Sequence, residues 1–389
     1  MNYNHPQAQK TAAFVRVVCG FLFCFFSFFF LWKIQGYVMG MAQHVLSGGL
    51  TVYSPLVGAG VITFLLLLLQ ILLNRIFRLE REWHTISFFP SFFTLAMLTS
   101  VNATAYTEFS LGYWIWFYPL CWFLFFCAVS FFKHLPSTYD ERAGGVAAKM
   151  LIPNLIIFLL FIVFCISFSN TDETLHHQMQ VEYLVSQKNY DDALEVGKGS
   201  KTINRETTAL RAYSLYKKNE MGERLFNYPQ KYGSEGLLLD LKDSVRMIFQ
   251  PMDLYRQFGA YPRFHKEPAL EFLELLDLSE KARQPMAEQY LLCAYLLDRK
   301  IDKFVLKLSE VYNLNDSVVE LPRYYGEALV MYLRRNPGRY AYRNEILETN
   351  YADYRNMVRS VHSSTLALNK TRRDFGTTYW WYYDALSKE

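Results

Sequence analysis

The sequence lacks the motifs on which most enzyme assignments depend. It contains no GxxxxGK[ST] phosphate-binding loop, no GxSxG or GxSG serine-hydrolase motif, and no CxxC or Cys/His spacing typical of a metal site. These absences argue against an ATPase, a serine hydrolase and a zinc module. We therefore predict no enzyme class, no cofactor and no metal.

Cysteine is also scarce where a disulfide would matter. Five of the six cysteines lie in apolar runs, and Cys293 alone lies beyond residue 170. The second half of the chain therefore cannot form an internal disulfide. The other five are interpreted as small apolar residues, and they do not decide the compartment.

Charge is nearly absent from the first 170 residues. They hold nine of the 40 Lys and Arg residues and five of the 36 Asp and Glu residues, which leaves 31 of each sign for residues 171–389. A neutral second half without a basic excess is not typical of a nucleic-acid-binding surface. Nucleic acid is therefore not an expected partner.

Long apolar runs fill the same 170 residues. The last, MLIPNLIIFLLFIVFCISF, extends from Met150 to Phe168, and as a helix it covers roughly 28 Å, close to the thickness of a bilayer core. Five transmembrane spans are predicted, at about 14–32, 55–76, 86–104, 111–132 and 150–168. The span at 86–104 has the weakest pattern, because it carries Pro90 and several hydroxyl residues.

The positions of Lys and Arg in the short loops predict the orientation. The loops 75–85 and 133–149 each carry three basic residues, whereas the alternate loops, 33–54 and 102–112, hold only Lys33 between them. The positive-inside rule places the N-terminus and the two basic loops in the cytoplasm. Five spans then place residues 171–389 outside it, which is the periplasm of a bacterium or, in a eukaryote, a lumen or the exterior.

Residues 171–389 show helical periodicity and little strand signal. The string KNYDDALEVGK resembles the turn of a tetratricopeptide repeat, on the positions of Asn189 as the helix N-cap, Tyr190 and Ala193. Met221 lies 31 residues after Tyr190 in a fainter second copy, and a third helix pair is predicted at 285–297 and 301–312. We predict an all-α fold, with a five-helix transmembrane domain at 1–170 and a tetratricopeptide-like α-solenoid at 171–389.

Two segments carry a resemblance that covers most of the chain. LFNYPQKYGSEGLLL at 225–239 and TTYWWYY at 377–383 resemble an uncharacterised family of Bacteroidota inner-membrane proteins with a C-terminal tetratricopeptide-like region. The resemblance implies a bacterial inner membrane with the repeats in the periplasm. It implies no reaction.

The aromatic C-terminus is the most unusual feature of the second half. Its side chains could form a partner-binding surface together with two arginines. The predicted residues are Tyr379, Trp380, Trp381, Tyr382, Arg334 and Arg335. The alternative interpretation is a final helix whose aromatic rings cap the end of the solenoid.

These observations favour a membrane scaffold or adaptor for an envelope protein complex, with protein partners and the lipid bilayer as its contacts. The alternative is a membrane-embedded enzyme or transporter component that acts on a lipid or a lipid-linked sugar. Such an enzyme would depend on Glu108, Arg81 or Lys133, the charged groups at the ends of the spans. A third hypothesis is a structural subunit whose spans pack on partner helices.

Overall fold

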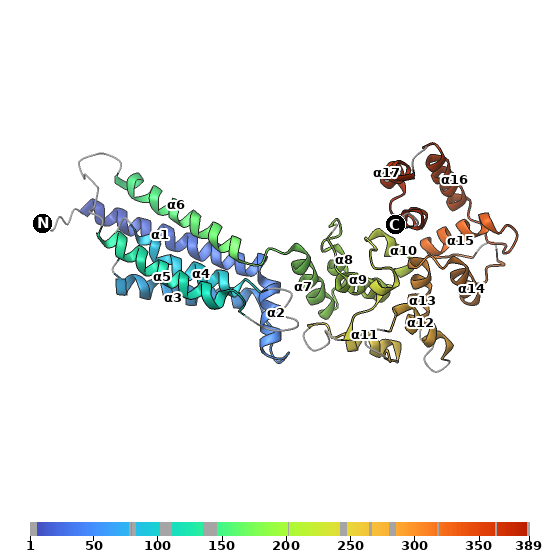
Figure 1. Ribbon diagram of the computed structural model, residues 1–389, viewed down its shortest axis with the longest axis horizontal. Coiled ribbons are helices and arrows are strands. Elements are labelled where there is room, and N and C mark those ends of the chain that lie inside the picture. Colours follow the sequence, from blue (N-terminus) through green and yellow to red (C-terminus); the bar gives the residue numbers. More distant parts are fainter. Residues whose placement is uncertain are drawn as a thin grey trace. The chain divides into compact units, whose positions relative to one another are not determined.

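The fold is all-α within the part of the chain that the structure describes, as the sequence predicts. The computed structural model (Figure 1) describes residues 6–77, 79, 83–101, 111–134, 146–200, 202–241, 247–263, 267–279, 285–316, 319–361 and 364–386. Packing divides the chain into unit 1, residues 1–179 and 246–248, and unit 2, residues 180–245 and 249–389. The boundary at residue 179 falls inside a helix, a little after the boundary expected at 170.

Unit 1 consists of long apolar helices with short helical segments between them. They are α1 (Pro6–Phe29), the π-helix η1 (Phe30–Ile34), α2 (Gly36–Leu46), α3 (Pro55–Phe77), the 3₁₀-helix η2 (His84–Phe88), α4 (Phe89–Leu98), α5 (Trp114–His134), α6 (Val146–Phe168) and the start of α7 (Glu173–Ser186).

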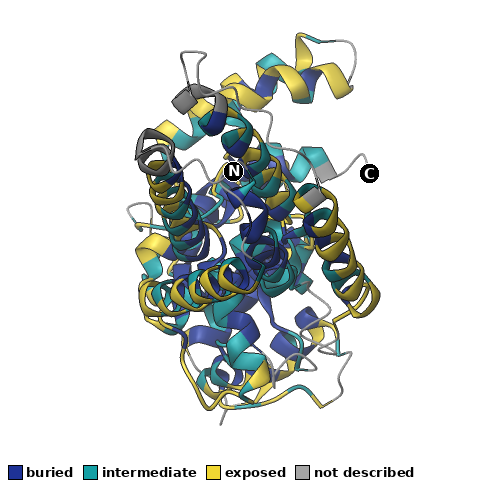
Figure 2. Ribbon diagram, turned by 90° about the vertical axis from the view of Figure 1, so that its left-hand side faces the viewer, coloured by how far each residue is buried: buried dark blue, intermediate teal, exposed yellow. Residues whose placement is uncertain are grey.

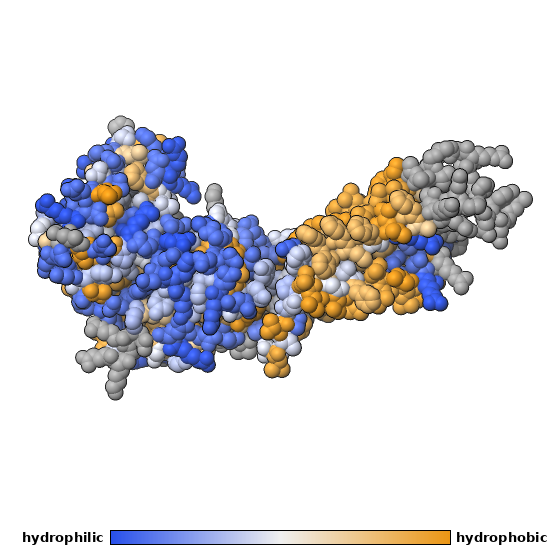
Figure 3. Space-filling model, turned by 180° about the vertical axis from the view of Figure 1, so that it is seen from behind, coloured by the Kyte–Doolittle hydropathy of each residue, from blue (hydrophilic) through white to orange (hydrophobic). Residues whose placement is uncertain are grey.

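Four of these helices are long and apolar enough to cross a membrane, which indicates a membrane protein. They are Ala12–Ile34, Pro55–Phe77, Trp114–Lys133 and Met150–Phe168, and they coincide with four of the five predicted spans. Figure 3 shows the apolar surface of unit 1 in orange. The remaining predicted span, 86–104, coincides with the shorter apolar helix His84–Leu98, and residues 102–104 lie outside the described part of the chain.

The centre of unit 1 is filled by phenylalanine rings. Phe92 of α4 lies with its ring centroid 5.3 Å from that of Phe23 in α1 and 5.3 Å from that of Phe158 in α6. All three side chains are buried, whereas Phe21 and Phe25 on the other side of α1 are exposed. Figure 2 shows this alternation of buried and exposed faces along the helices nearest the viewer. Exposed apolar faces of this kind suit contact with lipid.

Hydrogen bonds at one end of unit 1 align α1, η2 and α6. The Asn154 side-chain oxygen accepts from Thr85 N at 3.1 Å and from Thr85 Oγ1 at 2.6 Å, and Cys19 Sγ lies 3.5 Å from the same hydroxyl. The start of the η2–α4 segment is therefore level with residue 19 of α1 and residue 154 of α6.

A second set of hydrogen bonds aligns the other end. Asn170 N donates to Thr99 O at 2.8 Å, and the Asn170 amide donates to Val101 O at 2.6 Å. Gln35 Nε2 in turn donates to Asn170 O at 2.9 Å. The η2–α4 segment therefore runs parallel to α1 and α6 from one end of their packed length to the other.

Unit 2 consists of shorter helices that pack mainly on their neighbours in the chain. Its elements are the end of α7, α8 (Tyr190–Glu195), α9 (Arg205–Lys217), α10 (Met221–Arg224), the 3₁₀-helices η4 (Leu225–Asn227) and η5 (Gly233–Leu237), α11 (Pro251–Phe258), α12 (Ala269–Leu278), α13 (Pro285–Leu297), α14 (Ile301–Val311), α15 (Arg323–Arg335), α16 (Glu345–Arg359), α17 (Ser364–Phe375) and α18 (Tyr379–Leu386). Asn189 caps α8 through a bond from Asp192 N, which confirms the predicted N-cap.

The same turn joins α7 to α8, α9 to α10 and α13 to α14. One residue in each turn is left-handed, namely Lys188 (φ 59°), Asn219 (φ 57°) and Arg299 (φ 56°). In each case this residue donates its N–H to the carbonyl three residues back, and the next residue donates to the carbonyl five residues back. This is the Schellman motif, repeated in three helix pairs. No other non-glycine residue among those described has a positive φ.

Glycine at such a turn is expected to stabilise unit 2. A left-handed conformation costs an ordinary L-residue about 1–2 kcal/mol, most of which Lys188→Gly would remove. Lys188 is exposed, so little packing is lost. We expect unit 2 to gain about 1 kcal/mol of unfolding free energy, measured by pulse proteolysis of the full chain across a urea gradient. Gln187→Gly, one residue earlier, should lower stability instead, and equal effects at both positions would contradict the turn geometry.

Candidate functional site

The aromatic C-terminal helix is mostly inside unit 2. Tyr379, Trp380 and Tyr382 are buried, and Trp381 is half-buried. Their polar atoms are used within the unit: Tyr379 OH donates to Leu296 O at 3.2 Å, and Trp381 Nε1 donates to Leu368 O at 3.0 Å. This arrangement is the one expected of a capping helix, and it leaves little aromatic surface for a partner.

A buried carboxylate holds this helix in place. Glu327 of α15 accepts a bond from Tyr379 N at 2.6 Å, at the first residue of α18, and its other oxygen accepts from Arg323 Nε at 2.8 Å. Trp380 Nε1 donates to the Glu327 carbonyl at 2.7 Å. Burial raises the pKa of Glu327, although the Tyr379 N–H and the Arg323 guanidinium oppose that shift. The contact is a structural one, between a carboxylate and a helix N-terminus.

The two predicted arginines lie at the exposed end of α15. Arg335 Nη1 lies 3.4 Å from Tyr383 OH, and its guanidinium carbon lies 5.4 Å from the centroid of that ring. Arg299 lies on the same ring at 5.9 Å. The structure thus brings Arg335 to the aromatic helix through Tyr383, which the sequence analysis did not single out. Arg334 is exposed at the same helix end.

A separate pocket of about 310 Å³ lies within unit 2, between α9, the segment after η5, α11 and α12. The sequence analysis did not predict it. It is lined by Arg205, Glu235, Leu238, Leu239, Asp240, Leu241, Tyr255, Pro262, Glu267, Pro268, Ala269 and Phe272.

Hydrogen bonds between residues far apart in the sequence position the polar groups of the pocket. Arg205 Nε donates to Glu235 O at 2.7 Å, and Arg205 Nη2 lies 3.2 Å from Glu235 Oε2. The other oxygen of Glu235 accepts from Ala269 N at 2.8 Å, the first residue of α12. Tyr255 OH donates to Leu239 O at 2.7 Å, and burial raises the pKa of this phenol. The lining carries three carboxylates and one arginine, so the pocket favours a cationic group.

A third polar constellation lies inside unit 1. Gln70 Nε2 donates to Ser87 Oγ at 2.8 Å, and His84 Nδ1 lies 3.2 Å from Asn74 Oδ1. Both pairs connect α3 to η2, beside the Thr85–Asn154 contact described above. Buried polar side chains are costly in a membrane and often mark function. This layer was not predicted from the sequence, because its side chains are polar residues other than Asp, Glu, Lys and Arg.

The remaining candidate residues are placed as follows. Among the described residues no group of His, Cys, Asp or Glu could hold a metal ion. Glu108 and Arg81 lie outside the described part of the chain, and the Lys133 ammonium lies 5.7 Å from the ring centroid of Phe77.

Comparison with known proteins yields one family. The chain has no significant match among curated proteins or among solved structures. A family model described as a family of unknown function (DUF6057) matches residues 100–263 and 262–385. Because these matches cover most of the chain, the protein belongs to this family of unknown function.

Proposed function

We propose that this chain is an integral membrane protein whose second unit is a tetratricopeptide-like solenoid outside the cytoplasm. There it serves as a scaffold or adaptor for an envelope protein complex in a bacterial inner membrane. The observation that carries the proposal is the pocket in unit 2, on a chain anchored by apolar helices. The supporting arguments concern the number of spans, the helix pairs and the chemistry of the pocket.

The alignment of the η2–α4 segment supports a fifth span. Five residues of 3₁₀-helix and ten of α-helix together rise about 25 Å, more than the same number of residues in an α-helix alone. Its contacts begin where Thr85 meets Asn154 of α6 and end where Val101, just after α4, meets Asn170, just after α6. The segment therefore accompanies α6 over most of the apolar length of that helix. An odd number of spans, with basic loops in the cytoplasm, places unit 2 on the opposite side.

The repeated turn supports the solenoid. Three helix pairs with one turn geometry, each packed on neighbouring elements, are typical of helical repeat proteins, which use their extended surfaces for protein binding. Unit 2 has a largely hydrophilic surface, blue in Figure 3, and is suited to an aqueous compartment. We expect its partner to be a protein segment that reaches the pocket with a lysine or arginine side chain.

A charge reversal in the pocket is expected to release the partner. Glu267 lines the pocket, and its carboxylate accepts a bond from Arg263 N at 2.7 Å. Glu267→Lys would replace an attraction for a basic side chain by a repulsion. We expect the yield of the crosslinked partner to fall at least tenfold, measured by in-cell crosslinking, mild-detergent purification and mass spectrometry of the full chain.

The control is Glu271→Lys, which reverses an exposed charge on α12 outside the pocket and should leave the yield unchanged. A chain truncated after residue 170 should lose the partner completely. If Glu267→Lys and Glu271→Lys have equal effects, the pocket is not the binding site. If the truncated chain keeps every partner, unit 2 is not the scaffold.

The polar layer inside unit 1 favours the alternative function, a component that acts on a lipid or a lipid-linked sugar. Gln70, His84 and Asn154 are each less than 6% exposed, and Gln70 and Asn154 lie inside apolar helices. The same purification separates the two functions, because a lipid that is retained by residues 1–170, without a protein partner, would support the alternative.

A further inference from the structure

Arg211 in α9 is a buried cation whose hydrogen-bonding capacity is mostly unused. Its side chain is 3% exposed. A guanidinium has five N–H donors, yet Nη2 alone has an acceptor, the Val196 carbonyl at 2.5 Å. Its Nε and Nη1 have no hydrogen-bond partner. The ring of Tyr228, with its centroid 5.3 Å from the guanidinium carbon, covers one side.

A second unused group lies one turn earlier on the same face of α9. Thr207 is 1% exposed, and its hydroxyl has no hydrogen-bond partner. The neighbouring Thr208 differs, because its hydroxyl donates to Asn204 O at 3.0 Å in the usual helical way. Residues four apart on a helix are neighbours, so Thr207 and Arg211 present their unused atoms together. An unmet buried donor costs about 1–3 kcal/mol, which is a strong reason to expect an acceptor there.

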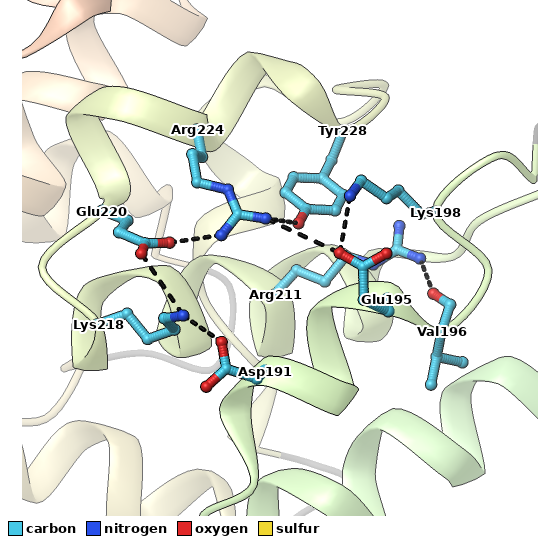
Figure 4. A network of polar contacts seen from close by, with 9 residues as sticks. All are labelled: Asp191, Glu195, Val196, Lys198, Arg211, Lys218, Glu220, Arg224 and Tyr228. Atoms are coloured by element: carbon cyan, nitrogen blue, oxygen red, sulfur yellow. Dashed lines mark hydrogen bonds and ion pairs between the residues drawn. The ribbon is translucent and has the colours of Figure 1, made fainter.

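The charges around Arg211 are balanced except for its own (Figure 4). Lys198 Nζ lies 2.7 Å from Glu195 Oε1, and Arg224 Nη1 lies 2.6 Å from Glu220 Oε2. Lys218 pairs with Asp191 and lies 3.5 Å from Glu220. Three of the four cations drawn in this network thus share three carboxylates. Arg211 has no carboxylate within ion-pair distance among the residues that the structure describes.

The acceptor that Arg211 does have belongs to a glycine-rich turn. Val196 is the first residue after α8 and is followed by Gly197, which has a φ of 55°. A side-chain carbon added at Gly199 would have no neighbouring atom within 4 Å. Glycines give such a segment conformational freedom. A carbonyl oxygen is a weaker partner for a guanidinium than a carboxylate, which forms charge-assisted bonds.

We propose that Arg211 and Thr207 form an oxyanion site that takes one carboxylate group, beneath the turn formed by residues 196–200. A single uncompensated positive charge matches a monoanion, and therefore a carboxylate rather than a phosphate dianion. The carboxylate comes from the C-terminus of a partner peptide or from a small free acid. The site is distinct from the acidic pocket and does not depend on the scaffold function.

The test uses the full chain in detergent and follows the midpoint of thermal unfolding of unit 2. Acetate, acetamide and inorganic phosphate are titrated at constant ionic strength, because acetamide has nearly the shape of acetate without its charge. Binding to the folded state raises the midpoint as ligand is added. We expect acetate to raise the unfolding midpoint. The apparent Kd obtained from the acetate titration should be at least tenfold lower than the value for acetamide or for phosphate. Equal shifts with acetate and acetamide, no shift with acetate, or a preference for phosphate would each overturn the proposal.

Substitution identifies the residue and the source of the carboxylate. Arg211→Met should abolish the acetate effect while the midpoint without ligand stays equal or rises, because an apolar residue removes an unpaired buried charge. Arg224→Met, the matched control beside Tyr228, should keep the acetate effect. Acetyl-trialanine, which has a free carboxylate, tests the source of the carboxylate. It should bind more tightly than acetate if the site takes a peptide C-terminus, and no more tightly than acetate if the site takes a small free acid. The C-terminal amide of the same peptide should not bind.

A purely structural role for Arg211 predicts a different result. Arg211→Met would then lower the midpoint by several degrees, with no acetate effect in the parent chain, and this outcome would overturn the proposal. Should Arg211→Met fail to fold, Arg211→Lys keeps the charge but loses the planar guanidinium. We expect that variant to weaken acetate at least threefold, and unchanged acetate binding by it would contradict the assignment.

Discussion

Trp380→Ala is expected to destabilise unit 2 by about 4 kcal/mol, the typical cost of removing a large aromatic side chain from a core. Trp380 is 1% exposed and lies against Tyr351, with ring centroids 5.1 Å apart. Its indole N–H donates to the Glu327 carbonyl at 2.7 Å. The substitution leaves a cavity and removes this hydrogen bond. The midpoint of pulse proteolysis across a urea gradient measures the loss.

The matched control is the next residue. Trp381 is half-buried and has one hydrogen bond, from Nε1 to Leu368 O. Trp381→Ala should cost about 1–2 kcal/mol, because less apolar surface is lost. A larger cost at Trp381 than at Trp380 would show that the helix presents the opposite face to the unit. That result would support the hypothesis that Trp380 binds a partner.

Glu327→Ala is expected to cost about 3 kcal/mol, since it removes a buried carboxylate that accepts bonds from a helix N–H and from a half-exposed guanidinium. The groups left behind are the Tyr379 N–H and the Arg323 guanidinium, at 2.6 Å and 2.8 Å from the carboxylate oxygens. Because Trp380 and Glu327 act on the same helix, the two effects should not add. The double variant should lose at least 1 kcal/mol less than the sum, measured in the same urea experiment.

The pH dependence gives a second test of Glu327. Burial raises its pKa above the ordinary 4.5, so the folded chain binds this proton more tightly than the unfolded chain. Unfolding free energy therefore rises as the pH falls through the folded pKa, and the gain is complete below about 4.5. Glu327→Gln cannot titrate, so the difference between the parent chain and this variant isolates the effect. A difference that moves in the opposite direction on acidification would contradict the burial.

The elements of this fold that depend on neighbours in the sequence could be predicted. The Asn189 side chain caps α8 by accepting a bond from Asp192 N, three residues later in the chain. The apolar run from Met150 to Phe168 forms one continuous helix. Both are local properties of a short string. The turns at Asn219 and Arg299 likewise lie where helical periodicity is interrupted.

The sites could not be predicted, because their residues are far apart in the sequence. The pocket brings Arg205 of α9 next to Glu235 of η5 and the start of α12. Inside unit 1, Asn154 reaches Thr85 across 69 positions. Arg211 was overlooked for another reason: a cation in a charged segment is usually solvated, and only packing shows that this one is enclosed.

The π-helix in the first apolar run sets the direction of the residues that follow it. Gln35 N bonds to Phe30 O at 2.8 Å, five residues back, so the helix contains one more residue than a regular turn would hold. A regular α-helix through the same residues would rotate everything after them by about 100° relative to this arrangement. This phase directs Gln35 toward Asn170, where its amide is used, instead of toward hydrocarbon. Deleting one residue between Phe30 and Gln35 would convert this π-turn into a regular α-turn, in which the bond from Gln35 N to Phe30 O and the inward direction of the Gln35 amide are kept. The run can therefore lose one residue here without losing the contact with Asn170.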